Sequence, residues 1–536
     1  MKDNTLDITG KLAEVEAKRQ KIMEGGGEKA VEKLLRSRGK LTPMERIELL
    51  FDPGTFHELG LWAKPLKTGF DIDNAEVPRD AMIAGYGEIH GRTVYATCYD
   101  PTVYGGSQAA MQFEKLAKAM QQARDEGVPY IGIIDSGGRR IQDLFGRWSY
   151  RSPTRLPYCE EGAFDMISPP MSSGVIPQIS LLLGPSVAGT AYSPVMADFV
   201  FFRKGTSHMA VASPQLLKSV TFQDVTWDEI GGAVLHATTT GTCDVLVDSD
   251  EEALLKCREL LKFLPSNWRE KPPFEDTGDD PNRREEGLIS ILPADPSQPY
   301  DIRSIIALLV DNGYFFEVQS LYAENVVIGL ARLAGQVVGV VANNPIKKSG
   351  AIDINSCDKE ARFIRTCDAF GIPLIFLVDT PGFLPSLEEE QSREGLARNA
   401  AKPIFAICES TVPKVSVYIR RCYGAGRLAM GTREMGIDAA FAWPAAEIRP
   451  MELESLVKQV YGEEIAKAKN PNEVIQSKVQ QLEAEFGEPY NSGSILAIDD
   501  IIDPRDTRAI LVKTLKRLSK KQEPARPWRK QGLIPL

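Results

Sequence analysis

Short, uninterrupted apolar runs alternate with longer amphipathic segments along most of the chain. Tyr130–Ile134 and Leu374–Val378 contain no charged residue, which is typical of strands that are covered on both faces of a sheet. Gln112–Glu126, just before the first run, has apolar side chains at helical spacing. Strands and helices that alternate in this way form βαβ units with right-handed crossovers, so the pattern predicts an α/β fold.

The pattern occurs twice, at a spacing of 244 residues that holds over roughly fifty positions. Pairs at this spacing are Gly85 and Gly329, Lys115 and Lys359, and the segments Gly127–Gly138 and Gly371–Gly382. Ile176–Ser180 recurs as Val412–Ser416 at a spacing of 236 residues, so the first copy carries a net insertion, which we place between Ile141 and Ser172. Two long copies differ from a solenoid of short repeats and predict two homologous domains in tandem.

Composition divides the chain into four parts. Residues 1–60 form a charged, helical N-terminal arm, in which Thr42-Pro43 and Glu45 predict a capping box. Residues 61–264 hold the first domain. Residues 265–300 contain seven prolines and a dense charge cluster and are the predicted linker. Residues 301–536 hold the second domain and a helical C-terminal tail.

The overall composition excludes several classes of function. A net charge of −10 disfavours nucleic acid and anionic membranes as main partners. No apolar run approaches the length of a membrane span and no signal-peptide core is present, so we expect a cytoplasmic protein without membrane insertion. The eight cysteines include no Cys-x-x-Cys pair and only four histidines occur, so no metal site is predicted.

Small residues gather where the predicted strands end. Four such clusters occur, two in each copy: Asp135–Gly138, Gly184–Thr190, Asp379–Gly382 and Tyr423–Gly426. A turn of this kind leaves backbone N–H groups open to a ligand and can hold an oxyanion or a phosphate, although a tight turn without function has the same sequence. No cluster fits a Walker A loop.

Acid–base residues are scarce at these turns. Ser136 has no Gly-x-Ser-x-Gly context, which disfavours a nucleophilic serine. The pair Arg139-Arg140 is consistent with either phosphate binding or a surface salt bridge. Two sets of backbone donors suit a reaction in which two carbonyl oxygens gain negative charge and the substrates supply the base, such as enolate formation from a thioester.

Further motifs run in order along nearly the whole chain: Gly25–Lys29, Glu45–Gly54, Ser173–Ser180, Asp353–Ser356, Asp379–Pro385, Asp499–Pro504 and Arg526–Lys530. With the strand-end turns, they resemble the carboxyltransferase (β) subunits of biotin-dependent acyl-CoA carboxylases and decarboxylases, a two-domain branch of the crotonase superfamily. The resemblance implies a site at a dimer interface, with acyl-CoA on the first domain and carboxybiotin on the second domain of the facing copy.

The resemblance also assigns residues. The turns at Ala188-Gly189 and Ala425-Gly426 would stabilise the enolate oxygen and the ureido oxygen of biotin, respectively. The acyl-CoA would contact Ser136, Gly137, Gly138, Arg139, Thr190, Arg427 and Leu428. Biotin would contact Gly382, Phe383, Tyr423 and Gly424.

Partners follow from what the chain lacks and from the family. The sequence has no Met-Lys-Met biotinylation site and no ATP-grasp signature, so biotin, its carrier and the biotin carboxylase would belong to other chains. Members of this family are usually hexamers built from three dimers, and the resemblance implies the same assembly here. Propionyl- and acetyl-type members carry an aspartate where this chain has Leu428, which predicts a larger branched, unsaturated or aromatic acyl group. The insertion near 145–165 would either line the acyl site or embellish the surface.

Three alternatives stay open. The chain could be the decarboxylase subunit of a sodium-pumping system, which runs the same half-reaction in reverse. It could be a non-catalytic assembly subunit that binds a CoA ester without turnover. It could also perform biotin-independent crotonase chemistry.

Overall fold

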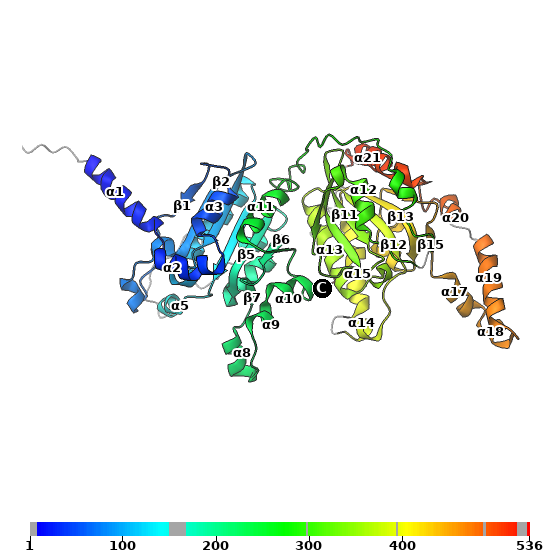
Figure 1. Cartoon of the computed structure of the whole chain (residues 1–536), viewed down its shortest axis with the longest axis horizontal. Helices are drawn as coiled ribbons and strands as arrows, with labels where there is room; N and C mark the ends of the chain where they lie inside the picture. The colour runs from blue at the N-terminus through cyan, green and yellow to red at the C-terminus, as the bar shows by residue number, and fades with distance from the viewer. Residues whose placement is uncertain are drawn as a thin grey trace, which may run out of the picture. The chain divides into compact units, whose positions relative to one another are not determined.

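The computed structural model describes residues 8–148, 168–295, 298–392, 395–485, 489–521 and 533–535. The chain forms two compact units, residues 1–268 and 269–536, each built around one mixed sheet (Figure 1). The predicted α/β fold with two homologous domains is confirmed. Most of the predicted insertion near 145–165 lies outside the described residues.

The first unit contains an eight-stranded sheet in the order β1-β2-β3-β4-β5-β6-β8, with β7 paired to β5. β1 to β3 pair antiparallel and the other pairs are parallel. The strands are β1 (His57–Leu59), β2 (Met82–Ile89), β3 (Arg92–Tyr99), β4 (Tyr130–Ser136), β5 (Gln178–Val187), β6 (Phe199–Arg203), β7 (His208–Ala210) and β8 (Val245–Val247).

The second unit repeats this topology in the order β9-β10-β11-β12-β13-β14-β16, with β15 paired to β13. The register between the two central strands shifts at matching places, between Ile134 and Ser136 in the first unit and between Val378 and Thr380 in the second. The strands are β9 (Phe315–Val318), β10 (Val326–Leu333), β11 (Gln336–Asn343), β12 (Leu374–Thr380), β13 (Lys414–Tyr423), β14 (Ala439–Ala442), β15 (Glu447–Arg449) and β16 (Asp500–Ile501).

Helices cover the sheets and form the arm and the tail. The longest in the two units, α4 (Ala110–Glu126) and α13 (Ile354–Ala369), occupy equivalent places in the repeat. The first unit also has α1 (Ile8–Met23), α2 (Glu28–Leu34), α3 (Pro43–Leu50), α5 (Ile141–Trp148), α6 (Ser168–Ser172), α7 (Tyr192–Val195), α8 (Pro214–Thr221), α9 (Trp227–Gly231), α10 (Ala233–Thr238) and α11 (Asp250–Leu260). The second has α12 (Arg303–Leu309), α14 (Leu387–Gln391), α15 (Leu396–Glu409), α16 (Gly426–Ala429), α17 (Leu453–Val460), α18 (Gly462–Lys467), α19 (Pro471–Glu485), α20 (Tyr490–Ser494) and α21 (Thr507–Leu518).

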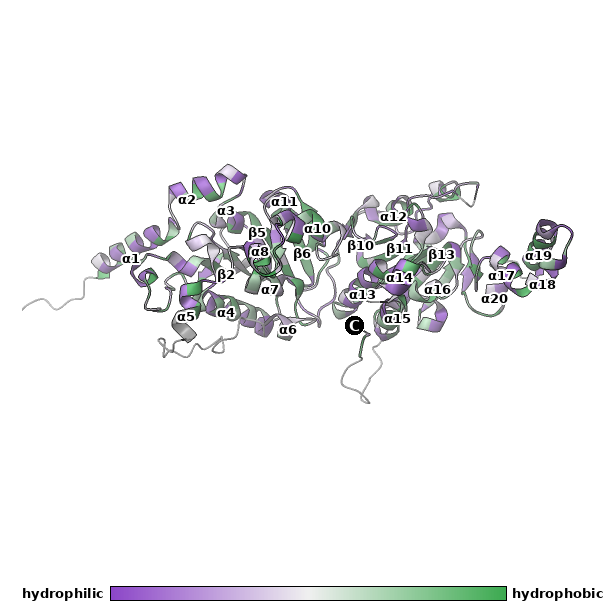
Figure 2. Ribbon diagram, turned by 90° about the horizontal axis from the view of Figure 1, so that it is seen from below, coloured by the Kyte–Doolittle hydropathy of each residue, from purple (hydrophilic) through white to green (hydrophobic). Residues whose placement is uncertain are grey.

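The sheets form the cores of the two units. Every residue of β4 and of β12 is buried, as expected for strands covered on both faces. In Figure 2 the central strands carry the hydrophobic colour, whereas the helices over them mix hydrophobic and hydrophilic residues. In the arm, the predicted capping box at the start of α3 is confirmed: the Glu45 amide donates to Thr42 Oγ1 and the Thr42 amide donates to the Glu45 carboxylate.

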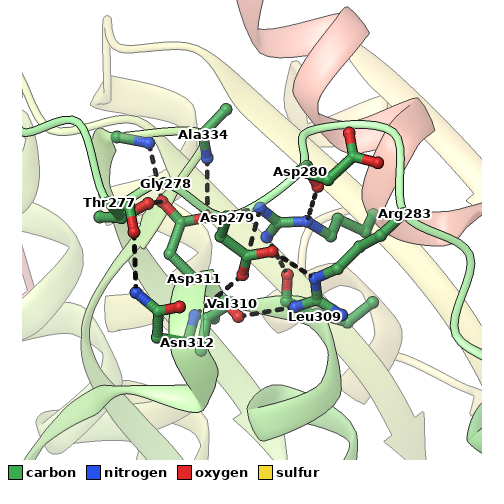
Figure 3. Close-up of polar contacts among 12 residues, drawn as sticks. Thr277, Gly278, Asp279, Asp280, Arg283, Leu309, Val310, Asp311, Asn312 and Ala334 are labelled. Atoms are coloured by element: carbon green, nitrogen blue, oxygen red, sulfur yellow. Dashed lines mark hydrogen bonds and ion pairs between the residues drawn. The ribbon is translucent and has the colours of Figure 1, made fainter.

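The proline-rich segment is bound to the second unit from residue 269 onward. Figure 3 shows its polar contacts around Asp311, whose carboxylate accepts from Thr277 at 2.8 Å and from the Arg508 guanidinium at 2.6 Å. Asp279 in the same segment pairs with Arg283 at 2.7 Å. Because Arg508 lies in α21, these contacts tie the segment to the C-terminal helix.

Candidate active site

In the first unit, the turns that follow β4 and β5 lie against each other. Gly138 has a left-handed backbone with φ +96°, and a Cβ added to it would lie 3.3 Å from the carbonyl oxygen of Val187. The Ser136 hydroxyl donates to the carbonyl of Gly106 at 2.8 Å and accepts from the amide of Gly138 at 3.2 Å. Ser136 therefore shapes the turn by bonding to the backbone.

The turn after β5 holds an unusual alanine. Ala188 has a φ of 54°, which costs a non-glycine residue roughly 1–2 kcal/mol. Two hydrogen bonds of 2.8 Å fix the turn around it, from the Thr190 hydroxyl to the Val187 carbonyl and from the Ser186 hydroxyl to the Thr190 carbonyl. Ala188 and Gly189 are partly exposed, so a ligand can approach their peptide groups.

In the second unit, the turn after β13 is packed still more closely against the turn after β12. A Cβ added to Gly426 would lie 2.6 Å from the Cα of Gly382, so only glycine fits there. Gly424, with φ 58°, holds the place of Ala188 in the repeat. Gly424-Ala425-Gly426 therefore corresponds to Ala188-Gly189-Thr190, and Ala425 is the exposed member.

Other predicted residues lie beside this second turn. Leu428 is half-buried, and its amide donates to the carbonyl of Ala425 at 3.0 Å. Arg427 pairs with Glu434 at 3.1 Å. Phe383 is half-buried and bridges to Ile352. The Tyr423 hydroxyl donates to Glu447, and burial together with this carboxylate raises the pKa of Tyr423.

The two adjacent arginines are both engaged within the first unit. The guanidinium of Arg139 lies 4.6 Å from the ring centroid of Phe113 and 3.7 Å from a carboxylate oxygen of Asp143. Arg140 is buried and pairs with Asp80 at 2.5 Å. Arg140 thus has an internal partner, whereas the role of Arg139 toward the substrate stays a prediction.

A strongly charged cluster, which was not predicted from the sequence, lies at the strand end in each unit. Asp135, at the end of β4, lies 2.5 Å from Lys40 and 3.1 Å from Arg46. Asp379 holds the matching position on β12. It accepts hydrogen bonds of 2.9 Å each from Arg420, Arg421 and the Tyr300 hydroxyl. The two aspartates stand at matching positions of the repeat, but the cationic side chains that pair with them come from positions that differ between the copies.

A cavity of about 680 Å³ opens beside the first pair of turns, within the usual size range of small-molecule sites. Gly137 and Val187 connect it to the turns. Pro185 belongs to the predicted small-residue cluster Gly184–Thr190, but the rest of the lining was not predicted from the sequence: Arg38, Gly205, Thr206, His208, Ser213 and Trp227. These residues come from separate segments, so no local motif reveals them. His208 Nε2 lies 3.1 Å from Asp228, and its ring is 6.0 Å from that of Trp227.

Burial limits the chemistry of one thiol in the first unit. Burial raises the pKa of the Cys98 thiol to about 12, which keeps it protonated at neutral pH. In the part of the chain that the structure describes, no group of three His, Cys, Asp or Glu side chains could hold a metal ion. The helices in that part include none long and apolar enough to cross a membrane.

The chain is similar to known carboxyltransferases along nearly its whole length. Residues 35–534 match the family model of the carboxyl transferase domain. The chain is 39% identical to the propionyl-CoA carboxylase carboxyltransferase subunit of Haloferax mediterranei, over 99% of this chain and 100% of the relative. It is 38% identical to methylmalonyl-CoA decarboxylase subunit alpha of Veillonella parvula, over 99% of each. A crystal structure of transcarboxylase 12S, a hexamer with methylmalonyl-coenzyme A and methylmalonic acid bound, matches with a TM-score of 0.92 at 39% identity, over 99% of both chains.

Proposed function

We propose a function for this chain from its family and its site. The chain belongs to the carboxyl transferase domain family. Its proposed function is that of the carboxyltransferase subunit of a biotin-dependent acyl-CoA carboxylase. The observation that carries the proposal is its similarity along nearly the full length to a transcarboxylase that binds methylmalonyl-CoA. The paired strand-end turns in both units agree with it, because the reaction places developing negative charge on two carbonyl oxygens.

The first unit is the proposed acyl-CoA side. The peptide groups at Ala188-Gly189 would donate to the thioester oxygen as it becomes an enolate, and loss of one such donor costs about 2.7–4 kcal/mol in related oxyanion sites. Thr190 would hold this turn through its bond to Val187. Ser136, Gly137, Gly138 and Arg139 would border the substrate, and the adjoining cavity provides room for it.

The second unit is the proposed biotin side. Its turn fits a ureido oxygen, because Gly426 packs directly on Gly382 and leaves the exposed Ala425 approachable. Gly424, Tyr423 and Phe383 would border the ring. Biotin, carried on another chain, would supply the carboxyl group and the base. Arg427 and Leu428 follow this turn and would reach the acyl group of a substrate bound to a facing copy.

The proposed acyl group is small, in contrast to the larger group expected from the sequence. The names of the relatives refer to propionyl-CoA and methylmalonyl-CoA and give no support to the bulky group that Leu428 suggested. We therefore propose the interconversion of propionyl-CoA and methylmalonyl-CoA, and the bulkier acyl groups become outcomes of the test.

A second candidate is the decarboxylase subunit of a biotin-dependent system. The similarity to a methylmalonyl-CoA decarboxylase subunit favours it about as strongly. The same turns serve both directions, so the partner chains decide. Copurification with an ATP-dependent biotin carboxylase would favour carboxylation, and a membrane decarboxylase partner would favour the reverse. We also propose a hexamer of this chain, as in transcarboxylase 12S, and retain a cytoplasmic location as a prediction.

The test is carboxyl transfer from methylmalonyl-CoA to free biotin by the purified chain, measured as formation of propionyl-CoA. A parallel panel would contain carboxylated CoA esters with branched, unsaturated and aromatic acyl groups. Preference for methylmalonyl-CoA is the expected result. Preference for a bulky ester would overturn the acyl assignment. If the chain binds CoA esters but transfers no carboxyl group from any of them, the result would indicate the assembly-subunit alternative. Turnover that does not require biotin would overturn the biotin-dependent reaction.

A further inference from the structure

Lys40, from the N-terminal arm, reaches the carboxyl end of β4. Its side chain is 2% exposed, and its Nζ atom lies 2.5 Å from Oδ2 of Asp135. Asp135 is followed directly by the turn Ser136–Gly138, and Gly138 packs against Val187. A buried cation from the arm is therefore bonded to the residue from which the turn starts.

The neighbouring strand leaves space for this ion pair. A Cβ added to Gly184 of β5 would lie 1.8 Å from Oδ1 of Asp135 and 2.8 Å from Nζ of Lys40. Both distances are far below van der Waals contact, so any other residue would displace the carboxylate. Gly184 lies four residues before Ala188, which places the pair between the two strands whose turns meet.

The second unit provides the same charge in a different way. At the positions of β13 that match Gly184 and Pro185 stand Arg420 and Arg421, whose Nε atoms each lie 2.9 Å from a carboxylate oxygen of Asp379. There the neighbouring strand supplies the cations, whereas in the first unit the arm supplies them. A strand-end aspartate that is paired with cations from unrelated positions in the two halves indicates a requirement of the turn itself.

Lys40 is also held firmly in place. Arg46 bridges Asp135 and Asp250 at 3.1 and 2.8 Å. Arg203 pairs with Asp250 at 2.6 Å and donates to the carbonyl of Gly39 at 2.9 Å. The backbone on either side of Lys40 is thus fixed to the ends of the strands, because the Leu41 amide also donates to Asp250, at 3.1 Å.

We propose that Lys40 is a positioning residue for the acyl-CoA side of the site. It holds Asp135 so that the turn Ser136–Gly138 supports Val187 and keeps the peptide groups of Ala188-Gly189 in place for the enolate oxygen. This inference rests on the proposed function. It predicts an effect on turnover more than on substrate binding, since the enolate charge exists only along the reaction path.

The test compares Lys40→Met with the unchanged full chain in carboxyl transfer from methylmalonyl-CoA to free biotin. Methionine keeps much of the length of lysine but removes the charge. We expect kcat to fall about tenfold to a hundredfold, the range typical of a small displacement in an active site, while KM for methylmalonyl-CoA stays nearly unchanged. Lys40→Arg restores the cation and should recover part of the lost kcat. Gel filtration and thermal unfolding would establish that each variant is folded and assembled.

A second variant keeps the inference testable if Lys40→Met does not fold. Gly184→Ala removes no charge but places a methyl group against the Asp135 carboxylate, and should give the same loss of kcat. Lys204→Met is the matched control, because it removes the exposed pair of Lys204 with Asp248, 2.8 Å apart, and should leave both kinetic constants unchanged.

Two results would overturn the inference, and they differ from each other. In the first, Lys40→Met and Gly184→Ala are both folded and have the kcat of the unchanged chain. The ion pair would then have only a structural role, and the proposed function would be unaffected. An unchanged chain that transfers no carboxyl group would refute the proposed function first, and the inference with it.

Discussion

At the residue scale, the two turns of the second unit pack directly against each other at Gly426 and Gly382. We predict that Gly426→Ala lowers carboxyl transfer by about a hundredfold or more, because the added methyl would push apart the two turns and their donors. The measurement is the initial rate with methylmalonyl-CoA and free biotin. Gly462→Ala is the matched control, since no atom of the described residues lies within 4 Å of a Cβ added to Gly462. Equal rates for the two variants would contradict the role of the second turn.

A second prediction at this scale concerns Glu360, which the repeat places where the first unit has Leu116. Glu360 is fully buried, and burial raises its pKa well above the usual range. Among the residues that the structure describes, neither of its carboxylate oxygens has a hydrogen-bond partner. We predict that Glu360→Leu stabilises the protein at neutral pH by about 1–3 kcal/mol, the cost of an unsatisfied buried polar group. The mirror variant Leu116→Glu should destabilise it. Urea unfolding monitored by circular dichroism measures both.

Glu360 also predicts the sign of a pH dependence. A carboxyl group with a raised pKa binds its proton more tightly in the folded state than in the unfolded state. Its contribution is therefore present below the unfolded pKa of about 4.3 and is lost as the pH rises toward the folded pKa. The stability gained by Glu360→Leu should grow between pH 5 and pH 7. A gain independent of pH would show that Glu360 has a partner in solution.

At the scale of elements, the sequence repeat predicted much of the fold, because the strands and turns are determined by patterns of neighbouring residues. Apolar strands and small-residue turns recur at fixed spacing, and the two sheets share strand order and the place of their register shift. The cations at Asp135 and Asp379 could not be predicted in this way. Lys40 is far from Asp135 in the sequence, and its counterparts Arg420 and Arg421 stand at positions that are Gly184 and Pro185 in the first copy.

The cavity beside the first turns shows the same limit. Arg38, His208 and Trp227 come from three segments that meet only in the folded unit, and each alone has the sequence context of an ordinary surface residue. The proline-rich segment is a related case. Its composition predicted a linker, but whether its charges bind solvent or a neighbouring helix depends on Asp311 and Arg508, which lie elsewhere in the chain.

The contacts of Figure 3 give a prediction for this segment and α21. Asp311 and Arg508 form a buried pair, and removing one member of such a pair typically costs about 3–5 kcal/mol. We expect that cost for Arg508→Met in urea unfolding. Arg517→Met, an exposed change on the same helix, is the control and should have little effect.

The same pair predicts a loss of stability in acid. Burial alone would raise the pKa of Asp311, but the hydrogen bonds from Gly335 and Arg508 outweigh it and lower the pKa overall. A depressed carboxyl pKa adds stability above the unfolded value of about 3.9, and that stability disappears as the pH falls through the folded value. The urea concentration at the midpoint of unfolding should therefore fall between pH 5 and pH 3. It should fall less for Arg508→Met than for the unchanged chain. An unaltered pH dependence would assign the acid sensitivity to other carboxylates.

At the scale of the whole molecule, the proposed acyl-CoA and biotin half-sites lie on different copies of the chain, so activity requires an oligomer. If acyl-CoA binds the first unit of one copy and biotin the second unit of its neighbour, a dissociated chain has both half-sites but cannot transfer between them. We predict a mass about six times 59.1 kDa in solution, as the hexamer of transcarboxylase 12S suggests, and a specific activity that falls when dilution dissociates it. Mass photometry and transfer assays over one dilution series test this together. Full specific activity from a species with the mass of one chain would mean that both turns serve a site within a single copy.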